Sequence, residues 1–244
     1  MSKNVGVYIH IPFCKKKCYY CDFTSFECKN EIILQYIGAL KNEIAVRAND
    51  HAYSIKTIYI GGGTPSYIDS NYIKEIIDTI RQNYSLNKLE EVTIEINPGA
   101  VTKEKLEEYK DMGINRISIG LQSTKNELLE KIGRIHNYEE FLNTYNITRK
   151  AGFTNINVDI MFGLPEQTLD DVDETINKII NLNPEHISTY SLILEEETSI
   201  YKMQYTYPDE ETERKMYWLI KRKLEDSGYI HYEISNFAKP RILF

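Results

Sequence analysis

The chain has 244 residues, 42% of them hydrophobic, and a formal net charge of −7, which suits one large α/β domain or two small ones. The acidic balance argues against an extended nucleic-acid interface. No apolar run approaches the roughly 20 residues of a membrane span, and the first residues lack the apolar core of a signal peptide. We therefore expect a cytoplasmic protein without a transmembrane segment.

Short β-rich segments alternate with amphipathic helical ones along the chain. Two of the helical segments end on a glycine, Gly113 and Gly152, directly before the next strand. Repeated βα units predict a parallel sheet with helices outside it, and six units predict an open, partial (β/α)6 TIM-like barrel. The six predicted strands begin at Val5, Lys56, Glu91, Asn115, Asn155 and His186.

Three cysteines, Cys14, Cys18 and Cys21, lie on the loop that leaves the first strand. Three thiolates at this spacing can hold three corners of a cubane iron–sulfur cluster and leave the fourth iron without a protein ligand. A disulfide scaffold would spread its cysteines over distant elements instead. For the fourth cysteine, Cys28, a small packed apolar residue is favoured over a metal ligand.

The same loop carries a basic run between its first two cysteines. A solvated loop is the favoured interpretation of Lys15, Lys16 and Lys17, and the alternative is a docking site for an acidic electron-donor protein. His10, on the strand that enters the loop, is expected to pack or to hydrogen-bond below the cysteines. We assign it no catalytic role.

A glycine run, residues 61–63, follows the second strand and continues into Thr64 and Pro65. Two interpretations stay open. The glycines can let the backbone approach a ligand closely, or they can make a tight strand exit in which Pro65 fixes the next turn. The run lacks the lysine of a P-loop and the GxGxxG spacing of a dinucleotide site, so phosphate binding is the poorer functional interpretation.

Polar side chains follow or interrupt three successive apolar strands. Glu95 and Gln122 end the third and fourth strands, and Asp159 lies within the fifth. Each alone is more often structural, but a buried carboxylate needs a partner. Together, at the same end of neighbouring strands, they predict a polar pocket beneath a glycine-lined rim.

Three further side chains are interpreted from their surroundings in the sequence. Arg134 follows a short helix and can clamp a carboxylate with its planar fork. His136, two residues later, is interpreted as a histidine of a surface loop. Trp218 lies within a helical pattern and is interpreted as a core residue.

With these features in view, the sequence resembles the radical S-adenosylmethionine (radical SAM) superfamily. The spacing Cys14-x3-Cys18-x2-Cys21, with Tyr20 before the last cysteine, is similar to its cluster signature. From about Tyr8 to Pro240, motifs occur in the order typical of the branch that contains oxygen-independent coproporphyrinogen III oxidase and the haem chaperone. These motifs are YIHIPFC, YCDF, GGGTPS, IEINPG, NRISIGLQS, GRIHNYEEF, NVDIMFGLPEQT and HISTYSL.

The resemblance implies a cofactor pair and its ligands. Cys14, Cys18 and Cys21 would bind a [4Fe–4S] cluster, whose fourth iron would take the amino and carboxylate groups of S-adenosylmethionine. Reductive cleavage of that cofactor would give a 5′-deoxyadenosyl radical, with the protein supplying orientation and exclusion of water. The positions that match the S-adenosylmethionine pocket are Tyr8, Tyr20, Gly62, Gly63, Thr64, Glu95, Gln122, Arg134 and Asp159.

The chain departs from the family pattern at both ends. It begins almost at the first strand and has Asp22 and Phe23 after the last cysteine, which is closer to the haem chaperone than to the oxidases. The chaperone group continues into a C-terminal domain with an HNxxYW-type motif that is absent here. We therefore expect residues 1–227 to form the radical SAM core and residues 228–244 to be the first strand of an otherwise missing domain. Without partners that strand would be an exposed edge.

Several functions stay open at this point. The first is a radical SAM protein of porphyrin or haem metabolism, most like the haem chaperone, with coproporphyrinogen III oxidase as the enzymatic alternative. A second is a haem-binding carrier without turnover, and a third is an inactive truncated remnant. The expected partners are a haem or porphyrin ligand and an electron donor such as a flavodoxin or ferredoxin.

Overall fold

The structure, a computed structural model of the chain, describes residues 3–48 and 53–240. Six parallel strands form a curved sheet in sequence order, and an antiparallel hairpin extends it, giving the order β1-β2-β3-β4-β5-β6-β8-β7. The predicted βα repeat is therefore confirmed. The strands are β1 (Lys3–Ile11), β2 (Tyr53–Gly62), β3 (Glu91–Ile96), β4 (Arg116–Gln122), β5 (Ile156–Phe162), β6 (His186–Ser191), β7 (Ile230–Glu233) and β8 (Asn236–Ala238).

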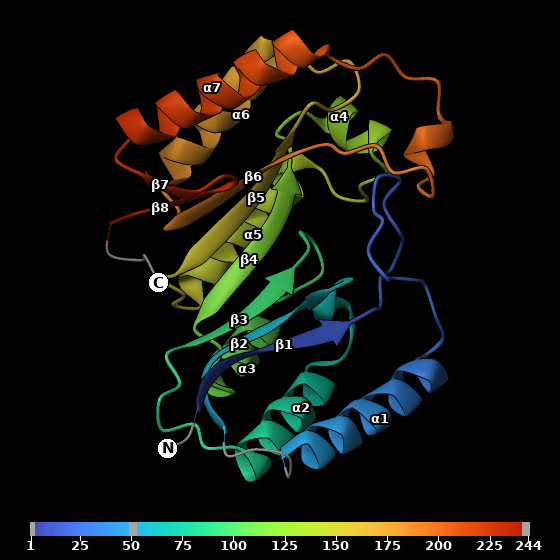
Figure 1. Cartoon of the computed structure of the whole chain (residues 1–244), viewed down its shortest axis with the longest axis vertical. Helices are drawn as coiled ribbons and strands as arrows, with labels where there is room; N and C mark the ends of the chain where they lie inside the picture. The colour runs from blue at the N-terminus through green and yellow to red at the C-terminus, as the bar shows by residue number, and fades with distance from the viewer. Residues whose placement is uncertain (1–2, 49–52, 241–244) are drawn as a thin grey trace.

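Helices connect the parallel strands and pack along the sheet. In Figure 1, α1 and α2 lie at the β1–β2 end of the sheet, whereas α6 and α7 lie at the end that carries β7 and β8. The helices are α1 (Asn30–Ala48), α2 (Ser70–Asn83), α3 (Lys103–Asp111), α4 (Asn126–Lys131), α5 (Tyr138–Lys150), α6 (Leu169–Leu182) and α7 (Glu210–Asp226), with 3-10 turns η1 (Pro65–Tyr67) and η2 (Ile200–Lys202).

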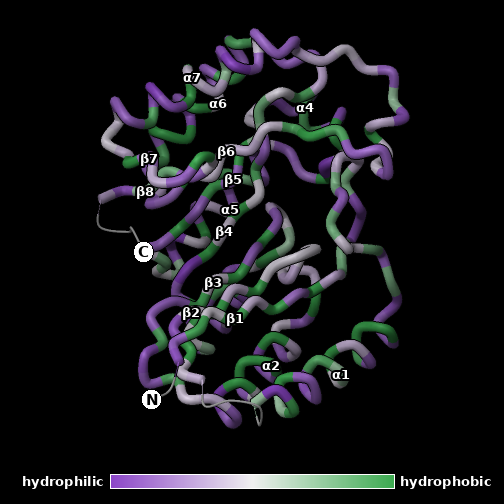
Figure 2. The backbone as a smooth tube through the Cα atoms, in the orientation of Figure 1, coloured by the Kyte–Doolittle hydropathy of each residue, from purple (hydrophilic) through white to green (hydrophobic). Residues whose placement is uncertain are grey.

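Helix α2 shows why these segments form as they do. Asp69 caps its N-terminus by accepting a hydrogen bond from the backbone N–H of Asn71 at 2.8 Å. Its isoleucines at 73, 76, 77 and 80 are buried, with the i, i+3, i+4, i+7 spacing of one helix face. Each contributes about 2 kcal/mol by leaving water. Figure 2 shows this segregation as hydrophobic and hydrophilic stretches that alternate along the helices.

The sheet has one apolar face and one polar face. In β5 the apolar Val158 and Ile160 are buried in the main core. Asn157 and Asp159, which alternate with them along the strand, lie on the opposite face. The parallel register sets Asp159 beside Ser188 on β6, so polar side chains of neighbouring strands adjoin one another. This polar face supplies the floor of the site described below.

The C-terminal segment joins the same sheet. The strand expected from Tyr229 is present as β7, and it pairs with β8, which itself pairs antiparallel with β6. The strand therefore has a partner within the chain, and β7 rather than β6 borders the sheet. The division of the chain at residue 227 stays a prediction, and residues 241–244 lie outside the described part.

Trp218 corrects one expectation. Its side chain is 53% exposed, so it is not a core residue. The buried face of α7 is formed by Met216, Ile220 and Leu224, at intervals of four residues, and Trp218 lies off that stripe. There its ring is approached by the ammonium group of Lys221, 5.7 Å from the ring centre.

Across residues 3–48 and 53–240, no helix has both the length and the apolar character that crossing a membrane requires.

Candidate functional site at the carboxyl ends of the strands

The cysteine loop is closed on itself just after β1. The backbone N–H of Phe26 donates to the carbonyl of Pro12 at 2.9 Å, and that of Cys14 donates to the carbonyl of Phe26 at 3.1 Å. The buried ring of Phe13 packs edge-on against Phe26, at 5.6 Å between ring centres. His10 ties the strand to this loop, because its Nε2–H donates to the carbonyl of Thr24 at 2.8 Å. The expected hydrogen-bonding role of His10 is thus observed.

The three cysteines face one cavity of about 390 Å³, and each has its own neighbour. Cys14 accepts a hydrogen bond from Thr64 Oγ1 at 3.5 Å, and Cys18 accepts one from Arg134 Nη1 at 3.6 Å. The Cys21 sulfur lies 3.7 Å from the Ser25 hydroxyl. In the described part of the chain, no three His, Cys, Asp or Glu side chains converge on a point where they could hold one metal ion. The thiols border a shared space instead.

A hydrogen-bond chain connects two of these sulfurs. Arg134 Nη2 donates to Asn97 Oδ1 at 2.8 Å, and Asn97 Nδ2 donates to Thr64 Oγ1 at 2.9 Å, which in turn donates to Cys14. Arg134 also donates directly to Cys18. Donors aimed at sulfur favour the thiolate form that binds metal. Burial raises the pKa of the Cys14 thiol, and the hydrogen bond from Thr64 opposes that rise.

The glycine run packs directly against the cysteine loop. The backbone N–H of Gly63 donates to the carbonyl of Ile11 at 2.8 Å. A Cβ atom at Gly63 would lie 2.9 Å from the backbone N and O of Phe13 and 3.0 Å from the Cys14 sulfur. Gly62 has a φ of 116°, which favours glycine. The absence of side chains at Gly62 and Gly63 is therefore needed where the chain leaves β2. Both glycines and Thr64 also line the cavity.

Glu95 lies on the floor of the cavity and, among the described residues, has no cation within salt-bridge distance. It accepts hydrogen bonds from Tyr59 Oη at 2.8 Å and from the backbone N–H of Gly62 at 3.1 Å. Burial raises the pKa of its carboxyl group to about 7, the negative charge of Asp159 adds to the rise, and the hydrogen bond from Tyr59 opposes it. The carboxylate is thus held in a place that disfavours its charge.

Asp159 is the second carboxylate of the floor. Ser118 Oγ donates to its Oδ2 at 2.9 Å, and Asn157 Nδ2 donates to its Oδ1 at 2.8 Å. Burial raises the pKa of this carboxyl group, and the two hydrogen bonds oppose the rise. Among the described residues, neither Asp159 nor Glu95 forms a salt bridge.

Arg134 borders the cavity between the cysteine loop and the sheet. Besides Asn97 and Cys18, its guanidinium group donates to the carbonyl of Gly120 at 2.6 Å. Its Nε atom is buried and has no hydrogen-bond partner within the described residues. Tyr20 lines the same wall, and burial raises the pKa of its phenol.

The predicted site residues come together with one exception. Gln122, at the end of β4 with a φ of 73°, lines the cavity, as do all the other predicted cofactor contacts except Tyr8. Tyr8 is 58% exposed, and its ring stacks on that of Tyr59 at a centre-to-centre distance of 6.1 Å. Its hydroxyl donates to His10 Nδ1 at 3.1 Å. Tyr8 is therefore separated from Glu95 by the ring of Tyr59 and lies outside the lining of the cavity.

His136 corrects a second expectation. It is buried rather than on the surface, because the loop after Gly133, whose φ is 75°, folds back onto the sheet. There His136 Nε2 donates to the carbonyl of Leu121 at 3.2 Å. Burial and the neighbouring positive charge of Arg134 lower the pKa of this histidine to about 3, so it stays neutral.

Sequence reasoning missed Asn97 and Tyr59. Asn97 lies two residues after Glu95, at the same strand end, which is the signal that would have found it. Tyr59 reaches Glu95 from the neighbouring strand, and only the register of β2 against β3 brings the two together.

A sequence model of the family described as Radical SAM superfamily matches residues 8–179. The chain is similar to the Heme chaperone HemW of Bacillus subtilis (strain 168), with 40% identity over 240 residues, covering 96% of this chain and 63% of that protein. It is similar to the protein of the same name from Escherichia coli (strain K12), with 37% identity over 241 residues, covering 97% and 63%. The chain thus spans just under two thirds of the length of these relatives.

A solved structure of coproporphyrinogen III oxidase (HemN) from Escherichia coli, described as a radical SAM enzyme, has the same fold with a TM-score of 0.90. The two are 28% identical, and the match covers 98% of this chain and 56% of that one. The predicted α/β fold class is thereby confirmed. Membership in this superfamily implies a [4Fe–4S] cluster and S-adenosylmethionine. The chain belongs to the radical SAM superfamily, in the branch that holds HemW and HemN.

Proposed function

We propose that this chain binds a [4Fe–4S] cluster through Cys14, Cys18 and Cys21 and S-adenosylmethionine in the adjoining cavity, and serves porphyrin or haem metabolism, most like the haem chaperone group. The observation that supports this most strongly is one shared cavity of about 390 Å³, which has three thiols on one side and the two buried carboxyl groups of Glu95 and Asp159 on its floor. Its volume lies within the range of small-molecule sites.

The residues around the cavity fit such a cofactor pair. The donors of Thr64 and Arg134 reach two of the three sulfurs and would stabilise thiolate ligands. The tight packing of Gly63 against Cys14 leaves the loop no room for another side chain. An ammonium group of a ligand would give Glu95 the close cation that none of the described residues supplies, and Arg134 Nε is a buried donor without an acceptor among those residues.

When bound and reduced, the pair supplies a 5′-deoxyadenosyl radical from S-adenosylmethionine. The residues of this chain hold and orient the ligand: the fixed carboxylates of Glu95 and Asp159 are presented from two strands, and Gln122 from a third. Apolar side chains, among them Met161 and Leu192, line the same cavity and exclude water from part of its wall.

An acidic electron donor, such as a flavodoxin or ferredoxin, is proposed to dock at the cysteine loop. Lys15 and Lys16 are exposed there, and beside them the ring of Phe23 is 65% exposed. Complementary charge would steer such a partner, so reduction by a flavodoxin should slow as salt is raised and when both lysines are replaced by glutamine. Reduction that is indifferent to salt would remove this part of the proposal.

Haem is the ligand class named in the relatives' descriptions, and HemN offers the enzymatic alternative. The two roles separate in one pair of measurements on the reconstituted protein. A shifted Soret band on adding haem, without consumption of coproporphyrinogen III, supports the chaperone-like role. Conversion of coproporphyrinogen III with formation of 5′-deoxyadenosine supports the oxidase role.

Anaerobic reconstitution tests the proposal as a whole. We expect about four irons per chain, and loss of the cluster in the single variants Cys14→Ala, Cys18→Ala and Cys21→Ala. Cys28→Ala is the matched control, because Cys28 packs against the core, away from the cavity lining, and should leave the iron content unchanged. Iron content that is indifferent to the three cysteines would refute the proposal. A wild-type chain that folds but holds no cluster would identify an inactive remnant.

A further inference from the structure

A chain of hydrogen bonds runs from Asp159 through the barrel interior to the C-terminal hairpin. Asn157 Nδ2 donates to Asp159 Oδ1 at 2.8 Å and to Ser118 Oγ at 2.8 Å. His186 Nδ1 lies 2.6 Å from Asn157 Oδ1, and His186 Nε2 lies 2.7 Å from the hydroxyl of Tyr232 on β7. The chain thus connects Asn157 on β5 with Tyr232 on β7, 75 positions later in the sequence.

The direction of every bond in this chain is determined. Because the amide nitrogen of Asn157 is used by Asp159 and Ser118, its oxygen must accept, so His186 carries its proton on Nδ1. His186 Nε2 then accepts from the hydroxyl of Tyr232. Burial lowers the pKa of His186 to about 3, and the imidazole therefore stays neutral. All donors point toward the carboxylate, and such chains polarise one another cooperatively.

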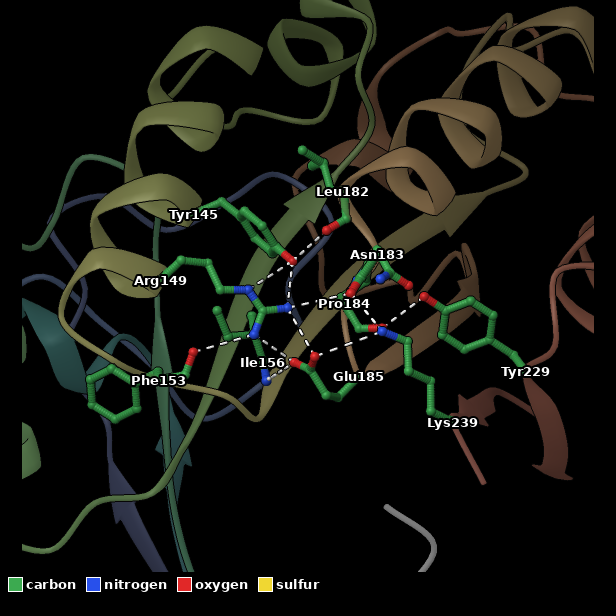
Figure 3. Close-up of polar contacts among 10 residues, drawn as sticks. All are labelled: Tyr145, Arg149, Phe153, Ile156, Leu182, Asn183, Pro184, Glu185, Tyr229 and Lys239. Carbon is green, nitrogen blue, oxygen red and sulfur yellow. Dashed lines mark hydrogen bonds and ion pairs between the residues drawn. The ribbon is translucent and has the colours of Figure 1, made fainter. Parts of the chain in front are cut away.

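The hairpin that supplies Tyr232 is fixed at both ends. Just before β7, Tyr229 Oη donates to the carbonyl of Pro184 at 2.7 Å. Just after β8, Lys239 Nζ donates to the carbonyl of Asn183 at 2.8 Å. Figure 3 shows these contacts converging with the Arg149–Glu185 ion pair, whose Nη1 and Oε2 atoms are 2.8 Å apart.

From this geometry we propose that Asn157 and His186 are positioning residues that orient Asp159 toward its ligand, and that Tyr232 holds the ring of His186 in place. The chain holds the carboxyl group of Asp159 in one orientation on the cavity floor, and the hydrogen bond from Asn157 opposes the rise in its pKa that burial causes. This assignment rests on the proposed function, in which Asp159 contacts S-adenosylmethionine. It gives the C-terminal hairpin a role in the cofactor site, although among the described hairpin residues none lines that cavity.

The test compares the affinity of the cluster-loaded full chain for S-adenosylmethionine among variants, by equilibrium dialysis. His186→Leu removes both contacts and should weaken binding about tenfold. His186→Gln, whose amide can donate to Asn157 and accept from Tyr232, should restore most of the affinity. Thr148→Val, which loses a buried hydrogen bond within α5, is the control and should bind as the wild type does.

Two further readouts separate positioning from a merely structural role. In an Asp159→Asn background, His186→Leu should cause no additional loss of affinity, because it acts through Asp159. The ¹⁵N chemical shifts of selectively labelled histidine should show His186 as the Nδ1–H tautomer in the wild type and also in Tyr232→Phe, because the oxygen of Asn157 accepts in both. Additive losses, or an Nε2–H tautomer in the wild type, would overturn the assignment.

The outcome for the wild type distinguishes the two proposals. If the wild type binds S-adenosylmethionine and His186→Leu binds it equally well, only the positioning role fails. If the cluster-loaded wild type does not bind S-adenosylmethionine, the proposed function fails and the positioning role fails with it.

Discussion

Replacing Glu95 with glutamine should stabilise the cofactor-free protein at alkaline pH while weakening its cofactor site. Burial, with a smaller contribution from the negative charge of Asp159, raises the pKa of this carboxyl group from 4.5 to about 7, and the more distant charge of Arg116 only partly offsets the rise. Glutamine keeps the shape and can still accept from Gly62 and exchange a hydrogen bond with Tyr59. The substitution therefore removes the charge and turns one of the two acceptors into a donor, which the hydroxyl of Tyr59 can accommodate.

The magnitude follows from linkage. Since the folded state binds the proton more tightly than the unfolded state, the stability from this group is complete below pH 4.5 and is lost as the pH rises to about 7. A difference of about 2.5 pKa units corresponds to about 3 kcal/mol. Glu95→Gln should therefore match the wild type near pH 4.5 and exceed its unfolding free energy by up to about 3 kcal/mol at pH 8.

Urea unfolding of the metal-free protein, followed by circular dichroism between pH 5 and pH 8, measures this difference. Glu130→Gln, on the exposed surface of α4, is the control and should follow the wild-type pH dependence. If Glu95→Gln and the wild type lose stability in parallel as the pH rises, the burial argument for Glu95 is wrong. In the cluster-loaded protein the same variant should bind S-adenosylmethionine more weakly.

Four other substitutions test the packing. Gly63→Ala forces a Cβ into the backbone of the cysteine loop, so it should lower the free energy of unfolding by about 1–3 kcal/mol and reduce the iron content. At Gly38 a Cβ would meet nothing within 4 Å, so Gly38→Ala in helix α1 should raise the free energy of unfolding by about 0.5–1 kcal/mol. Arg149→Met leaves the carboxylate of Glu185, 16% exposed, without its nearer cation and should cost about 2 kcal/mol in urea unfolding. Trp218→Ala should change the unfolding free energy by less than about 1 kcal/mol, and a larger loss would contradict its surface position.

The strands, the cysteine loop and the strand-end acids could be predicted because each depends on local pattern. A parallel sheet brings the carboxyl ends of its strands to one edge, so Glu95, Gln122 and Asp159 were expected together before any distance was known. The same rule explains why Gly62 and Gly63 meet them.

The interactions between strands could not be predicted, because they depend on register. Tyr59 meets Glu95, and His186 meets Asn157, only through the alignment of β2 with β3 and of β5 with β6. The part of the sheet's polar face beyond the predicted pocket, with Asn157 and His186, was not predicted, since these residues looked like isolated exceptions in apolar strands. Trp218 was assigned to the core because a helical pattern does not reveal which stripe is covered until the neighbouring helix is known.

Electron paramagnetic resonance of the reduced, reconstituted protein, with and without S-adenosylmethionine, shows whether an iron of the cluster is open to this ligand. If an iron of the cluster is open to this ligand, the spectrum should change on its addition, and Asp159→Asn should require more ligand for the same change. A cluster of about four irons whose spectrum is unaffected by saturating S-adenosylmethionine would contradict the proposal that one iron is open to this ligand.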